Sequence, residues 1–356
     1  MRIKKIRITG LFKMYDHEIP LNMDERVTII HGPNGIGKTI ILSMLNNLFI
    51  NKIDDIKIIP FNTFTIYFED DSILNIDKQN IGILKTTDDF IKFKVYFIQT
   101  QRLSAKIQKI PKPLLTRPRL FDSTILSVLS LSEHLLNLIK TKLADSTALS
   151  QSLDSSFLTR LSNEDNHSDF TISEIENKLN NLENKRLHLI EAGILNKDEL
   201  GNVPIKIDEK ILNVYSVNIR DREAKLNLFD DLYYKISLFK KIVNSHLLDK
   251  KMSISKNDGL IFTSDIGSII PIDKLSSGEQ HLIVLFYEFL FKVEPDALIL
   301  IDEPELSLHV GWQVKFLKDL LEVVNLVGFD VLIATHSPQI INDRWDLTVQ
   351  LNRKVN

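Results

Sequence analysis

The chain has 356 residues, of which 44% are hydrophobic and 26% charged, and its formal net charge is −3. This composition predicts a globular protein of one large or two modest domains, with no general attraction to nucleic acid. The absence of cysteine excludes disulfides, thiolate chemistry and cysteine-held metal centres. No apolar stretch has the length of a signal peptide or a membrane span, so we expect a cytoplasmic protein without a membrane partner.

Residues 1–105 are predicted to form a β-rich lobe, because apolar residues recur in short strand-like segments. These segments lie around Ile6 and Ile8, at Arg26–His31, at Thr63–Phe68 and at Phe93–Ile98. The pattern becomes helical from about Thr124, and residues 106–251 are predicted to form a mainly helical insertion. Residues 252–356 return to strands and then alternate strands with amphipathic helices, as half of an α/β domain does.

Two long helices are predicted in the insertion. Thr171 and Glu174 form a capping-box pair, apolar residues follow at three- and four-residue steps, and Gly193 is placed to end this helix. The second helix is predicted from Leu226 to Leu247. The two helices either pair as a short antiparallel arm or pack flat on the domain, and neither arrangement permits a long coiled coil.

The segment from residue 32 to residue 39 matches the Walker A pattern, with the strand Val27–Ile30 before it and an apolar helix after it. Glycines let backbone N–H groups converge on phosphate oxygens, and the helix N-terminus adds its partial positive charge. Lys38 would reach the β- and γ-phosphates, and Thr39 would complete a magnesium shell. The predicted ATP-binding residues are Gly32, Pro33, Asn34, Gly35, Ile36, Gly37, Lys38 and Thr39.

Two adjacent acids, Asp302 and Glu303, follow the five apolar residues Ala297–Ile301. A strand that ends in two carboxylates places both at the carboxyl edge of a parallel sheet, where ligands bind in open α/β folds. We predict that Asp302 holds magnesium through water and that Glu303 is the general base for the attacking water. The alternative, that these acids cap the next helix, suits Glu305 better than the adjacent pair.

The segment Leu275–Gln280 resembles the signature motif of ABC ATPases, and its LSSGEQ form is closer to SMC-like and OLD-like ATPases than to transporters. In that family the motif binds the γ-phosphate from the opposite subunit, here through Ser276, Ser277, Gly278 and Glu279. The resemblance implies an α/β fold: an ABC/SMC-like ATPase head with a phosphate-loop sheet and a β-rich lobe, interrupted by the helical insertion. It also implies ATP and Mg²⁺ as ligands.

Two further segments resemble motifs of the same family. Val331–Pro338 is similar to the switch region, in which an apolar strand delivers His336 to the γ-phosphate. Tyr96–Leu103 is similar to the Q-loop, and Gln101 is its predicted contact to magnesium and to the attacking water. Gln99 is less suited to this role because it still belongs to the preceding strand.

The sequence departs from the transporter pattern at two points. Ser277 stands at the third signature position in place of glycine, and His309 ends the segment aligned with the D-loop in place of aspartate. The run Asp302–His309 is instead similar to the OLD-like branch and to ATPases of phage-defence systems such as Septu and retron-associated proteins. His309 leaves open whether this loop couples two subunits.

The resemblance implies a head-to-head dimer, or a higher homo-oligomer, in which ATP binding closes the head pair and hydrolysis opens it. No acidic metal cluster follows His336, so we expect that the chain does not cut nucleic acid itself. The resemblance to phage-defence ATPases implies that it senses a trigger or regulates a separate effector, a nuclease or toxin, in antiphage defence. A basic stretch from Lys106 to Arg119 is either a nucleic-acid contact or a solvated face. The alternative functions are a DNA-repair ATPase stimulated by nucleic acid and, on weaker grounds, the nucleotide-binding subunit of a transporter.

Overall fold

The computed structural model describes residues 2–78, 93–99, 128–163, 170–196, 207, 211–306 and 308–352. Gln101, the basic stretch after it and Ser307 lie outside these residues. The chain forms two compact units, one of Met1–Leu126 with Ser276–Asn356 and the other of Ser127–Leu275. Within the described ranges, every helix is too short or too polar to span a membrane.

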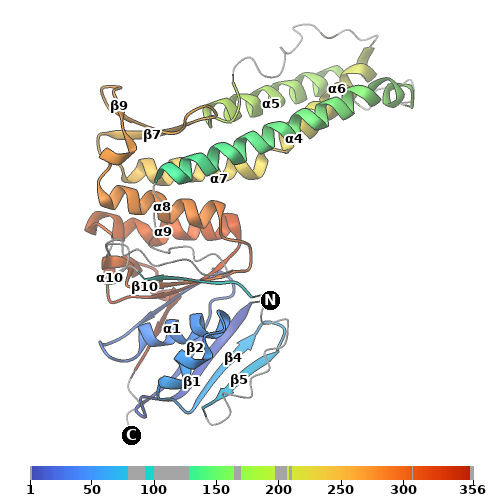
Figure 1. The fold of residues 1–356 in the computed structure, drawn as a ribbon. Helices are drawn as coiled ribbons and strands as arrows, with labels where there is room; N and C mark the ends of the chain where they lie inside the picture. Colours follow the sequence, from blue (N-terminus) through green and yellow to red (C-terminus); the bar gives the residue numbers. More distant parts are fainter. Residues whose placement is uncertain are drawn as a thin grey trace. The chain divides into compact units, whose positions relative to one another are not determined.

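The first unit contains two sheets (Figure 1). The parallel sheet has the strand order β12 (Thr348–Gln350), β3 (Val27–His31), β11 (Asp330–Ala334), β10 (Leu298–Asp302) and β6 (Val95–Gln99). The antiparallel sheet has the order β2 (Tyr15–Pro20), β1 (Ile3–Leu11), β4 (Thr63–Phe68) and β5 (Ile73–Asp77). Because β3, β11 and β10 are parallel neighbours, the segments that follow them meet at one edge of their sheet.

Helix α1 (Lys38–Phe49) follows β3 after a six-residue loop and buries Ile41, Leu45 and Leu48. These residues belong to one hydrophobic core cluster that includes side chains of both sheets. Figure 1 shows α8 (Ser277–Phe291) and α9 (Val310–Val327) on the other side of the parallel sheet. The described part of the unit also contains the short helices α2 (Ile53–Ile58) and α10 (Pro338–Ile341). The fold is therefore the α/β head that the motifs predict.

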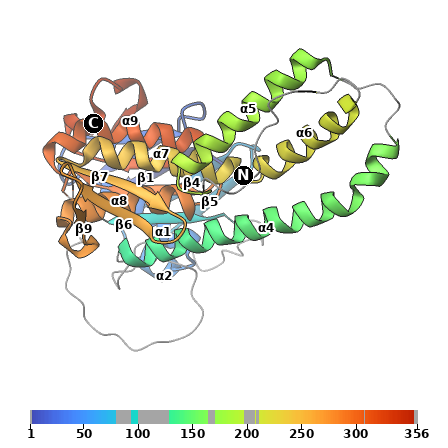
Figure 2. The same ribbon diagram turned by 90° about the horizontal axis from the view of Figure 1, so that it is seen from above.

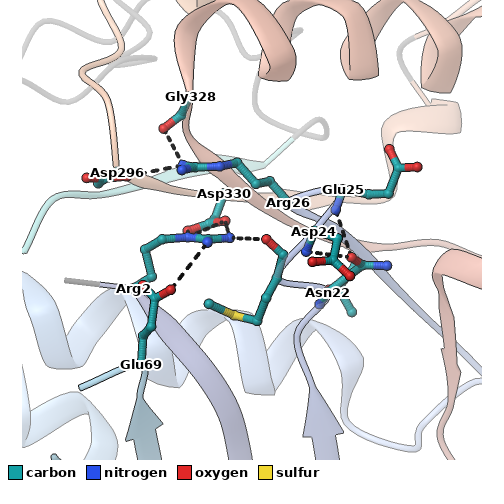
Figure 3. Close-up of polar contacts among 11 residues, drawn as sticks. Arg2, Asn22, Asp24, Glu25, Arg26, Glu69, Asp296, Gly328 and Asp330 are labelled. Carbon is teal, nitrogen blue, oxygen red and sulfur yellow. Dashed lines mark hydrogen bonds and ion pairs between the residues drawn. The ribbon is translucent and has the colours of Figure 1, made fainter. Parts of the chain in front are cut away.

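A buried ion pair joins the start of β1 to the start of β11 (Figure 3). The Arg2 guanidinium donates three hydrogen bonds of 2.7–3.2 Å to the Asp330 carboxylate and one of 2.9 Å to the Met23 carbonyl. Only 11% of the Arg2 side chain and 7% of the Asp330 side chain are exposed. The hydrogen bonds to Asp330 raise the pKa of Arg2 against the opposing effect of burial.

We expect the Arg2→Ala variant to lose about 3–5 kcal/mol of unfolding free energy, because the Asp330 carboxylate stays buried without its partner. Urea denaturation measures this loss. Lys4→Ala is the matched control, since the Lys4–Asp71 pair is exposed on both sides, and its midpoint should match wild type. An Arg2→Ala midpoint equal to that of Lys4→Ala would show that Asp330 finds other partners.

The second unit combines long helices with a small antiparallel sheet (Figure 2). Its helices are α4 (Val128–Asn163), α5 (Ile172–Glu191), α6 (Leu212–Asn227) and α7 (Asp230–His246). Its sheet has the order β7 (Lys250–Ser255), β8 (Gly259–Ser264) and β9 (Ile269–Ile270). Helix α6 contacts both α4 and α5.

The start and end predicted for α5 are confirmed. The Thr171 backbone N–H donates to Glu174 Oε2 at 2.8 Å, and the Glu174 N–H donates to the Thr171 hydroxyl oxygen at 3.4 Å, which completes the capping box. Gly193 follows the helix with a φ of 84°, a left-handed conformation that favours glycine. A Cβ at Gly193 would also lie 1.9 Å from the Ile254 carbonyl oxygen, so this position has no room for a side chain.

The second long helix differs from its prediction. In place of one helix from Leu226 to Leu247, the chain forms α6 and α7, which meet at Leu228 and Phe229. The apolar spacing runs across this break, so periodicity does not reveal it. Asp230 and Asp231 lie in the first turn of α7, where acidic side chains favour a new helix N-terminus.

The sequence patterns predict that the helical insertion ends at residue 251, whereas the second compact unit ends at Leu275. The strands after Lys250 pack with the helices that precede them, as the Ser132 hydroxyl of α4 accepts the Leu260 N–H of β8 at 2.8 Å. The Asn244 side chain of α7 bonds both the N–H and the carbonyl of Met252. The second unit therefore contains strands as well as helices, so a change from helical to strand-like sequence does not mark its end.

Candidate active site

The phosphate loop connects β3 to α1 and ends in a glycine whose backbone conformation and surroundings disfavour any side chain. Gly37 has a φ of 100°, and a Cβ there would lie 2.6 Å from Leu11 Cδ2. At Gly35, which has a φ of 80°, no atom of the described residues other than its chain neighbours lies within 4 Å of the position that a Cβ would take. The loop thus packs tightly on β1 at one point and offers an open glycine surface at another. This is the form of a cradle for a phosphate group.

His17 holds the phosphate loop through a hydrogen bond to its backbone, a contact that the sequence patterns do not predict. It is buried on β2, and its Nε2–H donates to the Ile36 carbonyl at 3.0 Å. Burial lowers the pKa of His17, and the Tyr15 ring stacks on it at 5.8 Å between ring centroids. A lone histidine in an alternating strand carries no sequence signal for this contact, because the register that places it under the loop is a property of the fold.

Lys38, the first residue of α1, is only 5% exposed and directs its ammonium back over the loop. Nζ donates to the carbonyls of Gly32 and Pro33 at 2.8 and 3.2 Å and lies 3.4 Å from His336 Nδ1. Burial lowers the pKa of Lys38, while Glu303 and two further carboxylates act to raise it. The charge is therefore held between the loop and the carboxylates.

Thr39 and Asp302 meet across 263 positions of sequence. The Thr39 hydroxyl donates to Asp302 Oδ1 at 3.0 Å. Burial raises the pKa of Asp302 to about 6, with the neighbouring carboxylates adding to the effect and the Thr39 hydrogen bond opposing it. A hydroxyl and a carboxylate beside a phosphate cradle are ligands that Mg²⁺ prefers, so the donor set fits a magnesium nucleotide.

The raised pKa of Asp302 predicts a pH dependence of stability in the absence of divalent metal. Because the folded protein holds this proton up to about pH 6 and the unfolded chain releases it near pH 4, stability falls as pH rises through that window. Asp302→Asn removes this dependence and should raise Tm at pH 7.5 by roughly 2–4 °C, for about 1 kcal/mol. Thermal unfolding at pH 5 and 7.5 in EDTA checks this. An equal gain at both pH values would assign the effect to another cause.

Glu303 follows β10 with a left-handed backbone, φ 50°, and its N–H donates to the Ala334 carbonyl of β11 at 2.8 Å. A non-glycine residue in this conformation is uncommon and is found at sites where the surrounding structure holds it. His336, after β11, has Nε2 3.9 Å from Glu303 Oε1. Since Lys38 offers only donors to Nδ1, the proton of neutral His336 is on Nε2, facing Glu303.

A hydrogen-bonded network around Glu305 holds the segment that carries His336, and sequence reasoning missed it. Glu305 Oε1 accepts the His336 backbone N–H, and Oε2 accepts the Thr335 hydroxyl, both at 2.8 Å. The Gln313 side chain donates to the carbonyls of Glu305 and Leu308 and accepts from the Ser337 hydroxyl. The only available signal was that Glu305 and Thr335 follow neighbouring parallel strands.

The signature segment forms the N-terminus of α8. Ser276 is the N-cap: its N–H donates to Glu279 Oε2 at 2.7 Å, and its hydroxyl accepts the Glu279 N–H at 3.3 Å, which together form a complete capping box. Ser276 and Ser277 are exposed, while Glu279 is buried. A Cβ at Gly278 would lie 3.3 Å from the Trp312 ring, which leaves little room for a larger residue. The N-terminus of α8 and the side chain of Ser276 are therefore both exposed to solvent.

His309 has a local role. It is the N-cap of α9, and its Nδ1 accepts the Gly311 N–H at 3.3 Å. The His309 ring also meets Trp312 edge to face. Of the other predicted residues, Asn34 and Ile36 lie in the phosphate loop as expected, and Gln101 lies outside the described residues.

A phosphate loop between a strand and a helix, with carboxylates at the end of a nearby parallel strand, defines a nucleotide-binding α/β domain of the P-loop type. The chain belongs to the AAA ATPase domain family, whose model matches residues 1–341. A search of curated proteins found no significant match.

Solved structures similar to the chain include SMC head domains. The SMC head domain from Thermotoga maritima shares 12% identity at a TM-score of 0.41, with 100% of this chain and 96% of that chain covered. The Smc head domain with an extended coiled coil bound to the C-terminal domain of ScpA, derived from Pyrococcus furiosus, shares 14% identity at a TM-score of 0.38, with 96% and 91% covered.

Proposed function

We propose that the chain is an ATP-hydrolysing head of the SMC-like and OLD-like type, which dimerises on ATP and regulates a separate effector. The observation that carries the hydrolysis part is the contact of Thr39 with Asp302, with Lys38 and His336 beside them. Three segments far apart in sequence supply a hydroxyl, an ammonium, an imidazole and two carboxylates to one edge of one sheet. This set suits phosphoryl transfer to water.

Each side chain has one role in the proposal. Lys38 exchanges its loop carbonyls for the β- and γ-phosphate oxygens, because these carry full charge. Glu303 accepts a proton from the attacking water, and His336 donates its Nε2–H toward the γ-phosphate. Thr39 and Asp302 would hold Mg²⁺, which neutralises phosphate charge when bound.

The dimer part of the proposal rests on the outward-facing signature. An exposed serine at a helix N-terminus is suited to bind a phosphate of another subunit. The expected result is that Lys38→Ala and Ser276→Arg chains, each inactive alone, recover part of the ATP turnover when mixed. In the mixed dimer one composite site has both its loop and its signature intact.

The mixing experiment uses steady-state phosphate release, with mass photometry to confirm that mixed dimers form. A mixture of Lys38→Ala with itself at the same total concentration is the control. Mixed dimers that form and yet recover no activity would exclude the arrangement in which one subunit completes the site of the other.

The effector part is tested by co-purification. The Glu303→Gln chain, expressed with the genes beside its own, is isolated with and without ATP. A nuclease or toxin that is retained supports regulation in antiphage defence. A dimer without a partner, whose wild-type ATPase activity rises with DNA ends, would instead support a DNA-repair ATPase.

A further inference from the structure

We propose that Glu305 is a positioning residue for hydrolysis, which fixes His336 by clamping the backbone of the switch segment. The proposal rests on the proposed function, since it assigns His336 a role in the reaction. Both carboxylate oxygens are used: Oε1 accepts the His336 N–H, and Oε2 accepts the Thr335 hydroxyl, at 2.8 Å each. Glu305 therefore contacts the segment that delivers the imidazole and not the imidazole itself.

The geometry favours a clamp because each contact fixes a different freedom of the switch segment. Thr335 is fully buried at the end of β11, so its hydroxyl is a fixed reference point. That hydroxyl also accepts the Ser337 N–H at 2.9 Å, which defines the turn on the other side of His336. With its own N–H held by Glu305, His336 is fixed in backbone position while its exposed ring faces Lys38 and Glu303.

Gln313 extends the clamp to α9. Its buried amide donates to the Glu305 and Leu308 carbonyls at 3.1 and 3.2 Å, and its oxygen accepts the Ser337 hydroxyl at 3.1 Å. Hydrogen bonds therefore join the segment after Glu303 to the segment that carries His336. A shift of Glu305 relocates the imidazole, and misplacement by about 1 Å costs on the order of 100-fold in rate.

The test compares Glu305→Ala with Glu305→Gln. Alanine removes both contacts, whereas glutamine still accepts the His336 N–H and can donate to Thr335 Oγ1. We expect Glu305→Ala to lower kcat about 10- to 100-fold with the Kd for ATP within about threefold of wild type, and Glu305→Gln to restore most of kcat. Glu294→Ala, which removes an exposed carboxylate paired with Lys94, is the control and should behave as wild type.

A double-mutant cycle with His336→Ala separates positioning from a merely structural role. If Glu305 acts through His336, the double variant is no slower than His336→Ala alone. Additive losses would overturn the proposal, and so would a large loss of ATP affinity in Glu305→Ala, which would make Glu305 a binding residue. An unchanged kcat in Glu305→Ala would overturn it as well.

Hydrogen–deuterium exchange gives a readout that does not need turnover. The peptide containing Ala334 to Ser337 should exchange faster in Glu305→Ala than in wild type, and at the wild-type rate in Glu305→Gln. Unchanged exchange in Glu305→Ala would overturn the clamp. A wild-type protein that shows the clamp by exchange but fails to hydrolyse ATP would overturn the proposed hydrolysis and the positioning role, while leaving the contacts themselves established.

Discussion

The Glu303→Gln variant is expected to bind ATP as well as wild type and to hydrolyse it about 10²- to 10⁴-fold more slowly, the usual contribution of a general base. Glutamine has nearly the same shape as glutamate and still places a side-chain oxygen near His336 Nε2. Its amide cannot accept a proton from water. Because Glu303 has a left-handed backbone that the Ala334 carbonyl holds, the substitution should leave the loop in place.

Single-turnover phosphate release and equilibrium binding of a fluorescent ATP analogue measure the two effects separately. If the heads dimerise on ATP, the variant should also accumulate as an ATP-dependent dimer in size-exclusion chromatography. The matched control is Glu294→Gln, which should retain full activity, because the Glu294 carboxylate lies before β10 and pairs with Lys94. Undiminished hydrolysis in Glu303→Gln would remove Glu303 from the role of base.

The Lys38→Ala variant is expected to lose about 10- to 100-fold in ATP affinity, because an ammonium that donates charge-assisted hydrogen bonds to phosphate contributes about 1.5–3 kcal/mol. The loss should be larger than for any exposed lysine, since Lys38 is buried and already directed over the loop. Lys13→Ala, at the exposed β1–β2 turn, tests this comparison.

Thermal unfolding is the necessary companion measurement for Lys38→Ala. The Lys38 ammonium bonds two loop carbonyls, so its loss could loosen the loop and lower affinity indirectly. An unchanged Tm with reduced affinity assigns the effect to phosphate contact. Unchanged affinity would show that the ammonium does not reach the phosphates.

The α/β fold was predictable because its elements have local signals. The five apolar residues before Asp302 and the segment Val27–Ile30 before the phosphate loop both indicate strands, and each of these strands pairs in parallel with β11. Loop glycines, the capping box of α5 and the N-cap of α8 are also local, since the residues that make them lie within a few positions of each other.

The contacts that fix the side chains of the candidate site were not predictable, because they depend on register between distant strands. His17 lies under Ile36 only because β1 pairs with β2 in one particular register. Glu305 reaches Thr335 because β10 and β11 pair with Asp302 opposite Ala334. A shift of the strand register by one residue would turn the side chains to the other face of the sheet. The sequence pattern within a strand does not specify which strand it pairs with.

The placement of β3 has a consequence for how the protein is made. This strand, which leads into the phosphate loop, pairs with β11 on one side and β12 on the other, both more than 290 residues later in the sequence. During synthesis, β3 and the phosphate loop therefore have neither neighbouring strand, β11 or β12, until nearly all of residues 1–350 have been translated. Contacts of such long range form late and leave apolar strands exposed to misassembly. The ribosome-bound chain should thus acquire its affinity for nucleotide only after Gln350 has left the exit tunnel.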